Sequence, residues 1–254
     1  MKLKVLLSYC TLVSLITLGS AQAGLGDFFD KLKDSVKADE PAAPTSETSS
    51  SNQQLIVSGL KQALNKGVDK AVTTLGKNDG FLQDASVKIL MPDPLSKVER
   101  GLRKIGKDKY ADQFITTMNR AAEKAVPKTT DILVNAVKQM TLQDAMGILK
   151  GEPDAATQYF KRTSAGHLQQ AIKPIVSDAT DSVGVTRSYK TMISKAGFLA
   201  SYIDEDSLDI DQYVTDKAID GLFVKIAEEE KLIRENPAER TTEILRSVFG
   251  DLLN

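Results

Sequence analysis

Residues 221–234 read GLFVKIAEEEKLIR, near the end of a helical pattern that we expect to run from about 209 to 235. On a helix with about 100° per residue, the apolar residues fall on one narrow stripe; they are Ala218, Leu222, Ile226 and Ile233. Glu229 falls inside that stripe, about 20° from its centre at Leu222. Glu230 falls about 80° away and can pair with Arg234 at i+4, which predicts an ordinary surface ion pair. The stretch therefore predicts a helix that buries the carboxylate of Glu229.

A buried carboxylate must find a cation, accept several hydrogen bonds or become protonated, because burying it alone costs several kcal/mol. Arginine suits the task, since its planar fork grips both carboxylate oxygens. The candidate buried polar cluster is Glu229, Arg120, Glu123 and Arg240, and the candidates for lining a pocket are Tyr159 and Phe160. Two interpretations stay open: a structural ion network, or a ligand or catalytic site with Glu229 as acid or base.

Helical periodicity continues from residue 55 to the end of the chain, and strand alternation is almost absent. Thr141 with Asp144 three residues later predicts a capping box at a helix start. We expect an all-α fold, with residues 55–254 forming a single multi-helix domain of roughly nine or ten helices.

Three further segments are predicted before this domain. Lys2 and Lys4 precede an apolar run, and Ala21-Gln22-Ala23 offers a small-x-small cleavage pattern, so residues 1–23 resemble a cleavable signal peptide. Residues 24–37 form a short amphipathic helix, with apolar residues on one stripe of 25–36, and residues 38–54 form a flexible linker rich in Pro, Ser and Thr. We expect an exported protein of the bacterial periplasm.

Composition excludes several classes of protein. Removing residues 1–23 from 254 leaves 231 residues with 31 basic and 34 acidic side chains, so the mature chain has net charge −3 and no basic excess for nucleic acid. Cys10 would leave with the signal peptide, which makes the mature chain cysteine-free and excludes thiol catalysis. His167 is the only histidine, so zinc and di-iron sites that need several are excluded. Phosphate-binding glycine loops do not occur, no apolar run of the mature chain is long enough to span a membrane, and we expect no metal or cofactor.

Several short motifs, in order along 55–250, resemble the bacterial family known as domain of unknown function 4197. They are Asn119-Arg120-Ala121-Ala122-Glu123, Lys138-Gln139-Met140 with Asp144-Ala145 and Ile148-Leu149, residues 155–160, residues 218–223, Glu228-Glu229-Glu230 with Ile233-Arg234, and Asn236-Pro237 through Arg240-Thr241-Thr242 to Val248-Phe249-Gly250. The resemblance implies a helical protein of the bacterial envelope and no established reaction, substrate or cofactor. Many members look like lipoproteins, but Cys10 lies too early in its apolar run, so we do not expect a lipoprotein here.

The first functional hypothesis is a non-enzymatic binding or scaffolding protein of the periplasm, with residues 25–36 docking on an envelope protein, on a membrane surface or back on the body. The alternative is a carboxylate-based enzyme or small-ligand-binding protein with Glu229 and an arginine at the site. A third hypothesis is storage of an apolar ligand between the helices. A water-accessible cleft that reaches Glu229 favours chemistry, and a dry, fully paired carboxylate favours a structural network.

Overall fold

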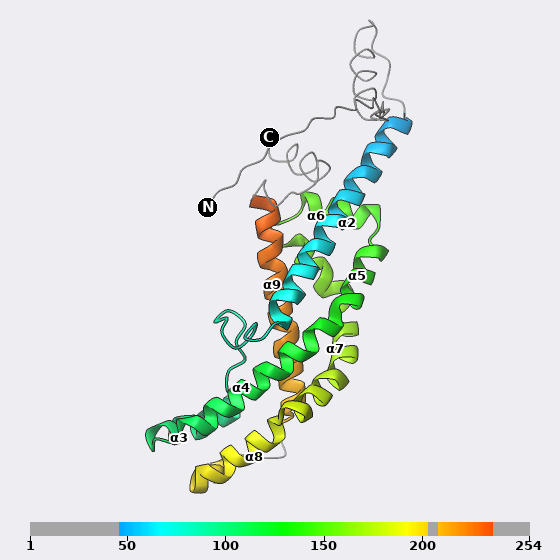
Figure 1. Ribbon diagram of the computed structural model, residues 1–254. Helices are drawn as coiled ribbons and strands as arrows, with labels where there is room; N and C mark the ends of the chain where they lie inside the picture. The colour runs from blue at the N-terminus through cyan, green and yellow to red at the C-terminus, as the bar shows by residue number, and fades with distance from the viewer. Residues whose placement is uncertain (1–45, 203–207, 236–254) are drawn as a thin grey trace, which may run out of the picture. The chain divides into compact units, whose positions relative to one another are not determined.

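The computed structural model describes residues 46–202 and 208–235, and these residues form helices and no β-strand (Figure 1). The α-helices are α2 (Ser46–Gly76), α3 (Ser96–Lys104), α4 (Asp108–Ala125), α5 (Thr130–Gln139), α6 (Leu142–Lys150), α7 (Ala155–Val183), α8 (Val185–Ala196) and α9 (Ile210–Glu235). Short 3-10 helices are η1 (Asp93–Leu95), η2 (Val126–Thr129) and η3 (Gly197–Tyr202). The all-α prediction is confirmed for this part of the chain. The predicted signal peptide, the helix at 24–37 and the expected total of helices involve residues outside the described ones.

The helix α2 begins at Ser46, inside the segment 38–54 that we predicted as linker, so residues 46–54 are helical and that boundary was wrong. From Leu60 onward this helix is anchored by buried side chains. Once a helix is nucleated in this way, each added residue gains a hydrogen bond, so it extends outward without needing an apolar face of its own.

The core is organised around α9, which contacts α7, α2 and α4 (Figure 1). Its buried residues therefore occupy a wide arc, from Gly221 on one side to Phe223 on the other, with Leu222 between them. The predicted capping box is present at α6, where Thr141 and Asp144 exchange hydrogen bonds. In the described residues, no helix is both long enough and apolar enough to cross a membrane.

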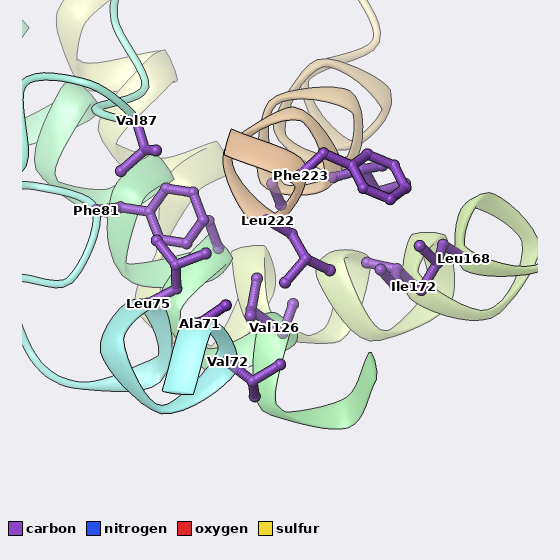
Figure 2. Packing of buried hydrophobic residues seen from close by; sticks show 14 of the residues in the cluster. Ala71, Val72, Leu75, Phe81, Val87, Val126, Leu168, Ile172, Leu222 and Phe223 are labelled. Atoms are coloured by element: carbon purple, nitrogen blue, oxygen red, sulfur yellow. The ribbon is translucent and has the colours of Figure 1, made fainter. Parts of the chain in front are cut away.

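The segment between α2 and η1, residues 77–92, is not helical but contributes to the core. Phe81 is fully buried, and Val87 and Ile89 are also buried. Figure 2 shows Phe81 and Val87 beside α9, with Leu75 and Leu222 nearby. This close packing depends on Gly221, because a Cβ at that position would lie 2.7 Å from Cε1 of Phe81 and 3.3 Å from Cβ of Val87.

We expect Gly221→Ala to lower the free energy of unfolding by about 1–2 kcal/mol, since overpacking of about 1–3 kcal/mol outweighs the gain in helix propensity. Gly147→Ala in α6 is the matched control, because nothing lies within 4 Å of a Cβ there. It should be neutral or stabilising by up to about 1 kcal/mol. Urea denaturation of both variants measures the difference, and equal stabilities would contradict the packing described for Phe81.

Candidate functional site

The carboxylate of Glu230 lies at the N-terminus of α7 and is fully bonded. Its Oε1 accepts a hydrogen bond of 2.9 Å from the backbone N–H of Ala156, and its Oε2 accepts bonds of 2.8 Å from the backbone N–H and the Oγ1 of Thr157. Arg234 donates from Nε and Nη2 to the same carboxylate, at 3.1 and 2.8 Å. The N-cap residue of α7, Asp154, makes no capping bond of its own. Glu230 therefore supplies from α9 the acceptors that the first turn of α7 needs.

Glu230 is only 6% exposed, so our prediction of an ordinary surface pair was wrong, although its pairing with Arg234 is present. The prediction failed because α9 is covered on several sides, and a position about 80° from the stripe centre is still inside the buried arc. The cavity that Glu230 and Arg234 help to line measures about 10 Å³, no more than the space for a single water molecule. Within the described residues, this cavity is too small to admit a substrate to the carboxylate.

Glu229 lies at the contact between α9 and α2. Gly67 of α2 packs against it, since a Cβ on Gly67 would lie 3.6 Å from the Cβ of Glu229, in ordinary van der Waals contact. Its side chain is 15% exposed and its Oε2 lies 3.1 Å from Nζ of Lys70. The cation beside Glu229 is thus a lysine of α2, which the sequence analysis did not consider. Arg240 lies outside the described residues.

Arg120 and Glu123 are brought together on α4, and they hold the turn that follows α2. Nη1 of Arg120 donates to Glu123 at 2.7 Å, and its Nη2 donates to Asp79 at 2.6 Å. The other oxygen of Glu123 accepts the backbone N–H groups of Phe81 and Leu82, at 3.1 and 3.3 Å. Glu123 is buried, and this network joins three charged side chains to backbone groups that would otherwise be unpaired.

Asn119, one residue before Arg120, fixes the next part of the same segment. Its Oδ1 accepts the N–H of Ile89 at 2.9 Å, and its Nδ2 donates to the carbonyl of Ile89 at 2.8 Å. The carboxamide thus pairs with an extended backbone in place of a neighbouring strand. Three residues of the motif Asn119-Arg120-Ala121-Ala122-Glu123 therefore bind residues 79–89.

The helix α9 also binds residues 77–92, through Lys225. Its Nζ lies 2.6 Å from Asp84 and 2.7 Å from Glu228, and it donates to Oγ of Ser86 at 3.1 Å. Lys225 is buried, and the sequence analysis did not consider it. Hydrogen bonds from Lys225 and Ser86 lower the pKa of Asp84 to about 2.

An open cleft of about 630 Å³ lies between α5 and α7. It is lined by Ile132, Asn135, Ala136, Gln139, Asp144, Tyr159, Thr163, Ser164, His167, Gln170 and Ala171. Tyr159 forms part of its floor and donates from Oη to the carbonyl of Ala136 at 2.9 Å. Burial, with the nearby charge of Asp144, raises the pKa of Tyr159. Phe160 is fully buried in the core and does not line the cleft.

The hydrogen-bonding groups of the cleft carry little charge. Asn135, Gln139, His167 and Gln170 are exposed, and their side chains make no hydrogen bond within the described part of the chain. The acid that lines the cleft, Asp144, is engaged in its capping box, and hydrogen bonds from Thr141 lower its pKa. The arrangement can bind an uncharged ligand, and no group of three or more potential metal ligands occurs in the described residues.

The motif on α4 lies within a stretch that matches a known family profile. The sequence profile of the proteins of unknown function called DUF4197 matches residues 50–250. The chain belongs to this family. No curated protein and no solved structure matches it. The match covers most of the chain and includes the α4, α7 and α9 residues that make the buried contacts above.

We expect Asp84→Asn to lower the free energy of unfolding at pH 7 by about 1–3 kcal/mol, because Lys225 loses a charged partner. The folded state lowers the pKa of Asp84 from 3.8 to about 2, so the stabilisation is complete above pH 3.8 and is lost as the pH falls through about 2. The difference between wild type and variant should therefore shrink across that window in urea titrations.

The control for this experiment is Asp220→Asn, on the exposed side of α9, where the pair with Lys217 is 3.6 Å long. It should change the stability by less than about 0.5 kcal/mol at every pH. An Asp84→Asn difference that does not vary between pH 5 and about 2 would contradict the ion pair with Lys225.

Proposed function

We propose that this chain is an exported, non-enzymatic binding or scaffolding protein of the bacterial periplasm, and that the cleft between α5 and α7 is its ligand-binding site. The observation that carries the proposal is the cleft itself, whose volume of about 630 Å³ falls in the range of small-molecule sites. Its free carboxamides, on Asn135, Gln139 and Gln170, can each donate and accept. An uncharged ligand with hydrogen-bonding groups fits this lining best.

The distribution of charge supports binding over catalysis. Glu123 and Glu230 each accept hydrogen bonds from backbone N–H groups and from an arginine, so neither has a free oxygen to move a proton. A general acid or base must reach the substrate. The alternative hypothesis, a carboxylate-based site with Glu229 and an arginine, has less support because Arg120 is already bonded to Glu123 and Asp79.

The proposal also includes export of the chain and docking of its N-terminal helix. The signal peptide 1–23 would deliver the chain to the periplasm, and the amphipathic helix at 25–36 would dock on an envelope protein. The linker that remains before α2 is 38–45, since the helix begins at Ser46.

The test is native mass spectrometry of the protein purified from its own envelope. We expect a copurifying molecule whose occupancy falls about tenfold or more in the double variant Asn135→Leu, Gln170→Leu, since each lost hydrogen bond contributes about 0.5–1.5 kcal/mol. Gln113→Leu, an exposed carboxamide of α4 outside the cleft, is the control and should leave the occupancy unchanged. Absence of any bound molecule, or equal occupancy in the double variant, would count against the cleft.

A further inference from the structure

Another surface of the body, where α3, α8 and η3 contact one another, combines exposed apolar side chains with basic side chains that form no ion pair within the described residues. Ile105, at the C-terminal end of α3, is 55% exposed, and Phe198, in η3, is 78% exposed. Both side chains therefore expose most of their apolar surface to water.

Contacts of three lysines join the elements of this surface. Nζ of Lys107 donates to the carbonyl of Lys195 at 3.2 Å, which joins the loop after α3 to the last turn of α8. The Nζ atoms of Lys109 and Lys195 lie 5.0 and 6.0 Å from the ring centre of Tyr110. Three lysines therefore gather beside the two protruding apolar residues.

The same surface continues along α8 as a basic groove of about 620 Å³. Arg187, Lys190 and Lys195 line it together with the hydroxyls of Thr191 and Ser194. Arg187 and Lys190 form no ion pair in the described part of the chain, and Asp181 is the one acid among the residues that line the groove. Three nearby acids, Glu99, Asp108 and Asp112, share the single cation Arg103.

We propose that this surface, which we call the α3–α8 surface, docks the protein on an anionic lipid membrane. It consists of Ile105, Lys107, Lys109, Arg187, Lys190, Lys195 and Phe198. Phe198 and Ile105 enter the boundary between headgroups and acyl chains, and lipid phosphates lie against the cations of α8. This goes beyond ligand binding in the α5–α7 cleft, which uses other residues.

Charge complementarity favours a membrane as the occupant. Basic side chains around protruding aromatic and aliphatic residues are typical of proteins that lie on a bilayer, and each cation near an anionic surface strengthens binding about fivefold. The mature chain is expected to have net charge −3, so attraction to an anionic surface must come from a local cluster such as this one.

The experiment is cosedimentation of the mature chain with vesicles of phosphatidylethanolamine and phosphatidylglycerol, compared with vesicles of phosphatidylcholine. The whole mature chain is used so that Asp204, Glu205 and Asp206, which lie outside the described residues, are present as competitors for the cations. We expect binding to the anionic vesicles, weakening as salt is added, and little binding to phosphatidylcholine.

Two variants locate the contact. Ile105→Ser with Phe198→Ser should weaken binding about tenfold or more, and Arg187→Gln with Lys190→Gln should weaken it by a similar factor and reduce its salt dependence. The control is Leu142→Ser, which removes an exposed leucine at the start of α6 and should bind as wild type does. Equal binding to both kinds of vesicle, or wild-type binding by the two double variants, would overturn the proposal and would assign any membrane contact to another segment, such as residues 25–36.

Discussion

Buried backbone N–H groups that no helix satisfies are the constraint on which this structure depends. They occur at the first turn of α7 and along residues 77–92, the long non-helical segment of the described chain. Each unpaired group would cost on the order of 1–3 kcal/mol. Side chains of the long helices supply the missing acceptors: Glu230 of α9 serves α7, and Glu123 with Asn119 of α4 serves the segment.

This arrangement explains why acids are buried in a protein for which we propose no acid–base chemistry. A carboxylate offers several acceptor sites, so Glu123 can bind two backbone N–H groups and Arg120 at once. The carboxylate of Asp84, in residues 77–92, likewise accepts bonds from Lys225 of α9 and from the N–H and Oγ of Ser86. The acids hold the body in one arrangement, whereas the open cleft between α5 and α7 carries uncharged groups that remain available to a ligand.

Periodicity in the sequence was sufficient to predict the helical class, the long helix α9 and the capping box at Thr141, because these depend on neighbours in the chain. The same reasoning placed Glu229 in a buried stripe, and its side chain is 15% exposed, but it missed the more deeply buried Glu230, since one stripe cannot represent a helix covered on several sides. The i, i+3 spacing of Arg120 and Glu123 is sufficient to predict that they can pair. Their contact with Asp79, and that of Lys225 with Asp84, join residues far apart in the chain, so no local pattern predicts them.

Hydrogen exchange of the backbone amides of Ala156 and Thr157 tests the central claim most directly. First-turn amides usually exchange fast because they lack an acceptor, and Lys109 in α4, a helix without a side-chain cap, provides the internal reference. If Glu230 binds these amides, they exchange as slowly as the interior of α7 in the wild-type protein. Exchange as fast as that of Lys109 would contradict the account.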